Sequence, residues 1–288
     1  MANKKMKQHL SKVLITGGTG MLGSYVDFGV KTNDHTLDVT DLESIRGACK
    51  KYSPTVILHL AAETDVDKCE RDPKRAYLVN AVGTYNAALA AREIAAKLFY
   101  ISTIGVFDGE KHGPYTENDP PNPINHYGHS KLLGELAIAS LLKDYCILRV
   151  CWMMGGGPER DKKFIAKIIH QLFTGAKEIK AITDQIGAPT FGKDVVKAIK
   201  ILLERDQRGI VHFPNKSSAS RFEVAKYIVE YFKPGVPVIA VEAGYFNLDA
   251  VRTKNETFSS KLNLDFVRPW QEALKEYLDT EWKKYLEK

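Results

Sequence analysis

The sequence has no long hydrophobic run. Its wholly apolar stretches are short, such as 56–58 and 60–62, whereas a helix needs roughly 20 apolar residues to cross a bilayer. Three lysines, Lys4, Lys5 and Lys7, lie within the first ten residues, but no apolar core follows them, which argues against a secretory signal. We therefore expect a cytoplasmic protein that has no contact with a membrane.

Cysteine is scarce and shows no paired pattern. The four cysteines have neither CxxC spacing nor the His/Cys spacing of a metal site; they are Cys49, Cys69, Cys146 and Cys151. In a chain of this size the pattern predicts reduced, partly buried thiols in a reducing compartment. We expect no bound metal.

A basic stretch of the kind that binds nucleic acid is also missing. The formal net charge is +6, but no basic run with interleaved aromatic residues follows the N-terminal lysines, so we expect no nucleic-acid partner. An anionic small molecule, such as a dinucleotide or a sugar diphosphate, needs only a few local cations. The charge alone does not identify the partner.

The sequence does have an alternating pattern of short apolar segments and helical segments. Hydrophobic residues make up 44% and charged residues 26%, as in globular proteins. The expected strands are 12–17, 56–60, 98–102 and 146–150, and the expected helices between them are 42–51, 73–96 and 127–142. This alternation predicts an α/β fold with a Rossmann-type, doubly wound parallel sheet.

The pattern changes after residue 150. Helices are expected at 161–174, 193–204, 221–231 and 270–285, with an extended segment at 237–241. We predict an NAD(P)-binding Rossmann domain at 1–150, to which 193–212 returns. A smaller substrate-binding domain is then formed by 151–192 and 213–288.

A glycine triplet follows the first expected strand. Gly17, Gly20 and Gly23 have GxxGxxG spacing and stand where a helix begins. A turn without side chains lets backbone N–H groups approach a pyrophosphate. In this context the triplet predicts dinucleotide binding.

The segment after the triplet is short for a Rossmann unit. Asp38 comes only 15 positions after Gly23, which predicts a compressed crossover and a very short second strand. Asp38 either contacts the adenine end of the cofactor or caps the helix that begins near Asp41. Lys31 is a candidate for binding a 2′-phosphate, although a solvated surface lysine is the simpler interpretation. The choice between NAD and NADP stays open.

Tyr127 and Lys131 stand four residues apart in an expected helix, so both side chains lie on one face. An ammonium group near a phenol favours the phenolate and lowers the pKa of the tyrosine from about 10. Such a tyrosine can give its proton to a carbonyl oxygen as hydride arrives at the carbon. Thr103 ends the third expected strand, where its hydroxyl can orient that carbonyl.

With these residues the chain resembles the extended short-chain dehydrogenases, and within them the dTDP-4-dehydrorhamnose reductases and related sugar-nucleotide reductases. The likeness covers nearly the whole chain. It is carried by the glycine triplet, 60–70, Asn80, Ser102 and Thr103, 106–109, the Tyr127/Lys131 pair, Arg149 with Trp152, and 184–190.

The resemblance implies roles for individual residues. Thr103, Tyr127 and Lys131 would be the catalytic triad. The residues along an NADP or NAD cofactor, with NADP slightly favoured, would be Gly17, Gly20, Met21, Leu22, Gly23, Asp38, Val39, Leu60, Ala61, Ala62, Thr64, Tyr127 and Lys131. The nucleoside-diphosphate sugar would meet Val66, Thr103, Trp152, Gln185 and Thr190. Core packing remains the alternative for Trp152, Asn80 is expected to be structural, and the family favours a homodimer.

Two departures from the family pattern bear on the substrate. Ile104 and Gly105 replace the Asp and aromatic residue that usually follow the catalytic Thr, and Glu63 and Asp65 replace His and Ala. Related epimerase-reductases have Cys at position 104, so Ile104 favours simple reduction. The expected reaction is reduction of the C4 carbonyl of a nucleoside-diphosphate 4-keto-6-deoxyhexose. The alternatives are an epimerase or dehydratase of the same fold, and a non-catalytic regulatory subunit that kept the dinucleotide pocket.

Overall fold

The computed structural model describes residues 10–287 and is built around a six-stranded parallel sheet. The strands β1, β3, β4 and β5 are almost wholly buried, as expected for a parallel sheet covered on both faces. In sheet order the strands are β10 (Gly209–His212), β5 (Tyr145–Val150), β4 (Lys97–Thr103), β3 (Val56–His59), β1 (Val13–Thr16) and β2 (Val30–Lys31). The predicted doubly wound sheet is confirmed. The lysines Lys4, Lys5 and Lys7 lie outside the described residues.

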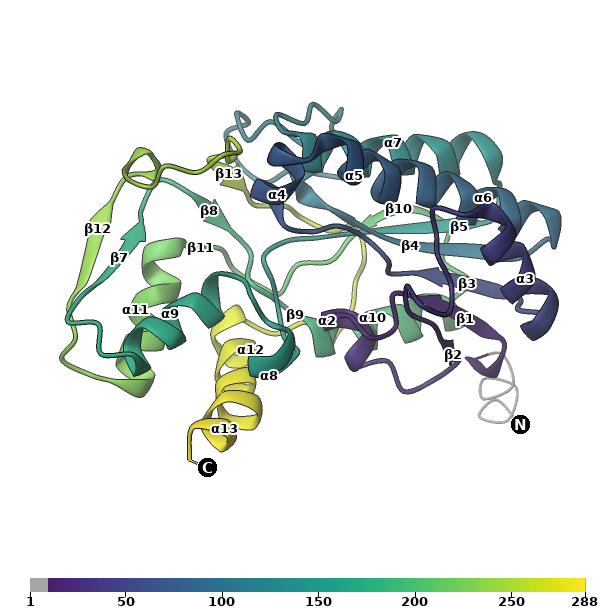
Figure 1. Ribbon diagram of the computed structural model, residues 1–288. Coiled ribbons are helices and arrows are strands. Elements are labelled where there is room, and N and C mark those ends of the chain that lie inside the picture. Colours follow the sequence, from purple (N-terminus) through teal and green to yellow (C-terminus); the bar gives the residue numbers. More distant parts are fainter. Residues whose placement is uncertain (1–9, 288) are drawn as a thin grey trace.

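Helices cover both faces of this sheet (Figure 1). One face packs against α3 (Leu42–Tyr52), α6 (Gly83–Glu93) and α7 (His126–Leu141). The other packs mainly against α10 (Gly192–Glu204). The helix expected at 73–96 consists of α5 (Pro73–Tyr77), a π-helical segment η1 (Leu78–Val82) and α6.

The rest of the chain forms a second lobe with its own hydrophobic core (Figure 1). Its helices are α8 (Gly157–Arg160), α9 (Phe164–Phe173), α11 (Arg221–Phe232), α12 (Trp270–Tyr277), the π-helical η4 (Leu278–Lys283) and α13 (Lys284–Leu286). Its short strands are β6 (Met153–Met154), β7 (Ile179–Ile182), β8 (Ile186–Gly187), β9 (Thr190–Phe191), β11 (Ala219–Ser220), β12 (Val238–Val241) and β13 (Asn255–Glu256). The stretch 193–212 belongs by position to the large sheet, since β10 pairs with β5.

Three further segments complete the path of the chain. They are α2 (Met21–Ser24), α4 (Val66–Arg71) and the 3₁₀ turn η2 (Ile104–Val106). The second lobe contains another 3₁₀ turn, η3 (Ala243–Tyr245). No helix among residues 10–287 is both long and apolar enough to cross a membrane. The four cysteines are all buried and free.

Candidate active site

The predicted site residues gather at the carboxyl edge of the sheet. The chain turns back between β1 and β3, because β2 lies on one side of β1 and β3 on the other. Ligands of such sheets bind in the crevice at this switch point. The glycine loop follows β1, Ala61 follows β3, Thr103 ends β4, and Trp152 follows β5.

The glycine loop is packed so tightly that side chains are excluded. Gly17 has a φ of +65°, and a Cβ there would lie 2.7 Å from the backbone nitrogen of Ala61. A Cβ on Gly23 would lie 2.5 Å from the carbonyl of Gly18. Met21 and Leu22 form the single helical turn α2 after Gly20. The loop therefore places bare backbone at the crevice, as a pyrophosphate requires.

The shortened crossover is present as predicted. The strand β2 has two residues, and the side chain of Lys31 at its end packs against Gly18. Asp38 is exposed and accepts hydrogen bonds from the backbone and hydroxyl of Thr40. Asp41 is the residue that caps α3, through the backbone N–H of Glu43. The alternative in which Asp38 caps this helix is therefore wrong.

The remaining residues predicted along the cofactor differ in exposure and in their contacts. Leu60 and Ala61 are tied to the end of β1 by hydrogen bonds from their backbone N–H groups to Thr16. Ala62 is half-buried and Thr64 is exposed. Val39 is buried beneath α6, where its carbonyl accepts a hydrogen bond from Asn86.

Thr103 and Tyr127 are brought together by the close approach of two backbone segments. A Cβ on Gly105 would lie 3.4 Å from the Thr103 hydroxyl oxygen and 3.8 Å from the Tyr127 ring, so both side chains border residue 105, and Thr103 accepts a hydrogen bond from the backbone N–H of Gly105 at 3.1 Å. A Cβ on Gly128 would lie 2.1 Å from the Gly105 carbonyl oxygen. The first turn of α7 can therefore touch η2 only because residue 128 is glycine.

Lys131 lies one turn further along α7 and is 3% exposed. Its Nζ donates to the carbonyl of Ile101 at 2.7 Å and sits 4.1 Å from the ring centre of Tyr100. Burial lowers the pKa of Lys131 to about 7. Burial also raises the pKa of Tyr127, an effect that the nearby Thr103 hydroxyl only partly offsets. The predicted lowering of the Tyr127 pKa is therefore wrong for this structure, because burial has the largest effect on this pKa and raises it.

Asn80 has a structural role, as expected, and that role supports the site. Its side chain is fully buried in η1. It accepts a hydrogen bond from the backbone N–H of Glu63 at 2.8 Å, and donates to the Glu63 carbonyl and to the hydroxyl of Ser130. Asn80 thereby fixes the loop after β3 to the helix that carries Tyr127 and Lys131.

The predicted substrate residues are placed in different environments. Val66 is half-buried at the start of α4. Trp152 is half-buried, and its indole N–H donates to the carboxylate of Glu256. Gln185 is 5% exposed, and its buried amide nitrogen has no hydrogen-bond partner among the described residues. Thr190 is fully buried and donates to the Ala188 carbonyl at 2.9 Å, so its contacts serve packing.

Glu256 is a site residue that the sequence gave no reason to select. It accepts hydrogen bonds from Trp152 and from the Thr253 hydroxyl, the latter at 2.7 Å. Its negative charge contributes to the raised pKa of Tyr127. Because it lies 129 positions from Tyr127 in the sequence, no local spacing could have indicated it.

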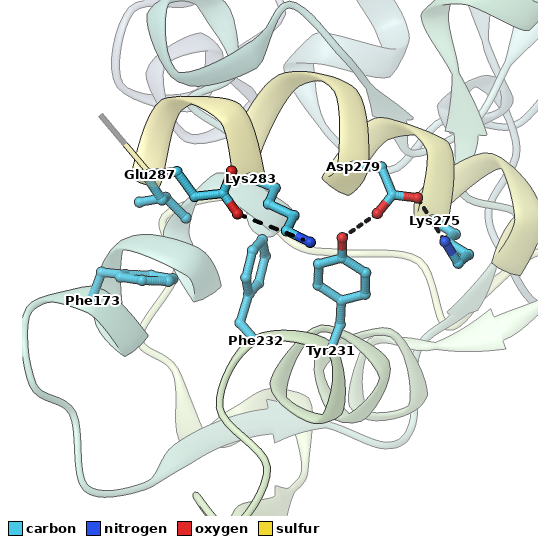
Figure 2. Close-up of a pocket in the computed structure, with 8 residues that line it drawn as sticks. Phe173, Tyr231, Phe232, Lys275, Asp279, Lys283 and Glu287 are labelled. Atoms are coloured by element: carbon cyan, nitrogen blue, oxygen red, sulfur yellow. Dashed lines mark hydrogen bonds and ion pairs between the residues drawn. The ribbon is translucent and has the colours of Figure 1, made fainter.

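A hollow of about 480 Å³ lies elsewhere, between α9, α11 and the C-terminal helix (Figure 2). Its polar side chains pair with one another: Asp279 accepts from Tyr231 and Lys275, and Lys283 lies near Glu287. It contains none of the predicted site residues. We therefore place the candidate active site at the carboxyl edge of the large sheet and not in this hollow.

A family model described as the RmlD substrate binding domain matches residues 11–282 of the chain. The chain belongs to this family. The spore coat polysaccharide biosynthesis protein SpsK of Bacillus subtilis (strain 168) is 33% identical over 280 residues, covering 93% of this chain and 97% of the relative.

Two further relatives of this RmlD-family chain differ in the function that their names state. The crystal structure of dTDP-4-dehydrorhamnose reductase from Bacillus anthracis str. Ames in complex with NADP is 32% identical, with a TM-score of 0.87. That match covers 93% of this chain and 98% of the other. The methionine adenosyltransferase 2 subunit beta of Danio rerio is 33% identical over 242 residues, covering 77% of this chain and 74% of the relative. The resemblance predicted from the motifs is confirmed.

The departures from the RmlD-family pattern have local explanations. Glu63 forms an ion pair with Lys68 at 2.6 Å, and Asp65 caps α4 by accepting the backbone N–H of Lys68. Ile104 is 3% exposed and packs in a small core beside the site. Both acids thus bind partners within their own segment of the chain.

Proposed function

We propose that this protein catalyses the NAD(P)H-dependent reduction of a keto group on a nucleoside-diphosphate sugar, at C4 of a 4-keto-6-deoxyhexose. This proposal rests on the position of the Thr103 and Tyr127 side chains, which lie close together at the sheet edge that also holds Lys131 and the glycine loop. The dTDP-4-dehydrorhamnose reductase relatives support it.

The residues present fit a bound dinucleotide. The backbone N–H groups of the glycine loop would hold the pyrophosphate, and Lys131 would hold the nicotinamide ribose. Lys31 lies beside Gly18 with its charge in solvent, which favours a 2′-phosphate and hence NADP. When bound, NAD(P)H supplies the hydride.

The side chains of the chain supply the proton and the orientation. Thr103 holds the carbonyl oxygen, and Tyr127 donates its phenolic proton to that oxygen. The raised pKa keeps Tyr127 protonated at neutral pH, as a proton donor must be. The charge of Lys131 then stabilises the phenolate that remains.

Replacing Tyr127 with Phe tests this role. We expect turnover to fall by roughly 10²-fold to 10⁴-fold, measured as NAD(P)H consumption with a panel of 4-keto sugar nucleotides. NADP⁺ should still bind, because the glycine loop and Lys131 are unaltered. Tyr85→Phe is the matched control, since Tyr85 is 44% exposed on the outer surface of α6. Full turnover by Tyr127→Phe would contradict the proposal.

A regulatory subunit is the second candidate, favoured by the likeness to methionine adenosyltransferase 2 subunit beta. If the protein is a regulatory subunit, it should bind NADP⁺ but consume no NAD(P)H with any sugar nucleotide of the panel. An epimerase or dehydratase would convert the sugar without net consumption of NAD(P)H. The division into a cofactor-binding domain and a substrate-binding domain, the homodimer and the cytoplasmic location stay predictions.

A further inference from the structure

A fully buried histidine beside the glycine loop has no part in the reaction proposed above. His59 ends β3, next to Thr16 at the end of the neighbouring strand β1. The Nδ1 atom of His59 lies 2.7 Å from the Thr16 hydroxyl, and its Nε2 atom lies 3.1 Å from the Thr84 hydroxyl on α6. Since Thr16 immediately precedes Gly17, this histidine links the start of the glycine loop to a helix that covers the sheet.

The contacts of Thr84 continue to the helix that carries Tyr127. The Thr84 hydroxyl donates to the backbone carbonyl of Asn80 at 2.7 Å. The Asn80 side chain donates to the Ser130 hydroxyl at 3.0 Å, and Ser130 donates to the carbonyl of Tyr127 at 2.8 Å. Together these contacts form one network from the end of β1 to the first turn of α7. The side chains in this network are all 0% exposed: Thr16, His59, Thr84, Asn80 and Ser130.

The direction of each hydrogen bond in the network can be assigned. The Asn80 carbonyl can only accept, so the single proton of the Thr84 hydroxyl is used there. His59 must then donate to Thr84 from Nε2. Burial lowers the pKa of His59 to about 3, so the ring is neutral and its Nδ1 carries no proton. That nitrogen accepts from the hydroxyl of Thr16, which itself accepts the backbone N–H of Ala61 at 3.3 Å.

Other protonation states of His59 are unfavourable in these surroundings. With a proton on Nδ1 alone, the single Thr84 proton would have to serve both the Nε2 atom and the Asn80 carbonyl. A doubly protonated ring would be a cation stacked on Tyr100, with 5.6 Å between the ring centres, and the Lys131 ammonium already lies 4.1 Å from the centre of that tyrosine ring. Buried groups are destabilised when they lose a partner or lie near a like charge. The structure therefore selects one tautomer of a neutral ring.

We propose that His59 is a positioning residue: as the neutral Nε2–H tautomer, it holds the start of the glycine loop in place relative to the first turn of α7. The inference rests on the proposed function, since the glycine loop would carry the cofactor and α7 carries Tyr127. A misplacement of about 1 Å between reacting groups can lower a rate by roughly 10²-fold. A fixed geometry between this loop and this helix therefore bears directly on turnover.

NMR spectroscopy of protein with ¹⁵N-labelled histidine tests the tautomer itself. We expect the His59 ring to be protonated on Nε2 only and to keep this state between about pH 5.5 and about pH 8, where exposed histidines titrate. The signals that are missing from the spectrum of His59→Gln identify those of His59. A proton on Nδ1, or a ring that becomes charged in this pH range, overturns the proposal.

Two substitutions at position 59 separate hydrogen bonding from packing. Phe keeps an aromatic ring against Tyr100 but has no polar atom, whereas the amide of Gln keeps one acceptor and one donor. We expect His59→Phe to weaken NADP⁺ binding and to lower kcat, each by roughly 10-fold, because the hydroxyls of Thr16 and Thr84 lose their partner. His59→Gln should remain within roughly threefold of wild type, and KM for the sugar nucleotide should be the same in all three proteins. Calorimetry with NADP⁺ and NAD(P)H consumption measure these values.

Thr84→Val tests the network at a position outside the glycine loop. Thr84 contacts His59 and Asn80, so the loss of its hydroxyl should weaken NADP⁺ binding only if the network holds the loop in place. We expect affinity to fall by roughly 3-fold to 10-fold. If His59→Phe does not fold, this variant and the NMR spectrum decide. A wild-type affinity for NADP⁺ in Thr84→Val, or in a folded His59→Phe, overturns the proposal.

His212→Phe is the matched control for the loss of a buried histidine. His212 ends β10, is 0% exposed and donates to the Ser259 carbonyl at 3.0 Å. Its substitution should lower the melting temperature but keep the wild-type affinity for NADP⁺. Equal losses of affinity in His212→Phe and His59→Phe would reflect general destabilisation and overturn the proposal. A wild type that binds NADP⁺ but turns over no sugar nucleotide contradicts the proposed function alone, since calorimetry and NMR still test His59.

Discussion

The amino group of Lys131 is buried in a way that couples folding to pH. Its pKa is lowered from an ordinary 10.5 to about 7 by burial. Between these values the unfolded chain binds more protons than the folded one, so stability from this group rises as pH rises.

Replacing Lys131 with Met should remove this dependence. From pH 7.5 to pH 9.5, the unfolding free energy of the wild type should increase by about 2 kcal/mol relative to Lys131→Met. Urea unfolding at the two pH values measures the difference. Parallel changes in both proteins would show that Lys131 has an ordinary pKa in the folded state.

Single residues also show where sequence reasoning succeeds and fails. Tyr127 and Lys131 were predictable because a spacing of four positions puts both side chains on one face of a helix. The direction of the Tyr127 pKa was not, since burial depends on segments far apart in the chain. Glu256 was missed for the same reason, because it meets Trp152 only through tertiary packing.

Among the elements, α7 shows how one glycine sets the position of a helix. A Cβ at Gly128 would overlap the Gly105 carbonyl, whereas a Cβ at Gly47 in α3 would have nothing within 4 Å. The two positions therefore form a matched pair for substitution by alanine.

We expect Gly128→Ala to lower the unfolding free energy by about 1–3 kcal/mol through overpacking, and to lower turnover because Tyr127 moves away from Thr103. Gly47→Ala should instead raise stability by up to about 1 kcal/mol through helix propensity. Thermal unfolding and NAD(P)H consumption measure both effects. Equal behaviour of the two variants would argue against a tight contact between α7 and η2.

The large elements were predictable because their apolar residues follow the periods of strands and helices. The four strands expected along the first 150 residues are all found within a few positions. The strands β8, β11 and β13 have two residues each and no period to detect. The π-helical segment in 73–96 was also hidden, because its side chains keep a helical pattern.

On the scale of the molecule, Tyr25 joins the two lobes. It follows the glycine loop, donates to Glu281 at 2.6 Å and accepts the backbone N–H of Gly156 at 2.6 Å. Its ring packs edge-on against Phe191. Glu281 belongs to η4 near the end of the chain, so this tyrosine connects the beginning of the fold to its end.

Replacing Tyr25 with Phe should lower the unfolding free energy by about 1–3 kcal/mol, because Glu281 and the Gly156 N–H lose their partner. We also expect weaker NADP⁺ binding, since α2 and the loop before it lose support. Urea unfolding and calorimetry measure the two effects. Tyr85→Phe again serves as the control, and unchanged values for Tyr25→Phe would mean that the lobes are held together by other contacts.

The link through Tyr25 has a practical consequence for anyone handling this protein. A purification tag or surface anchor attached after Lys288 would pull on the segment that carries Glu281, and we expect strain on that segment to reach the dinucleotide crevice through Tyr25. Nucleotide affinities measured on protein immobilised by its C-terminus should therefore differ from those measured free in solution.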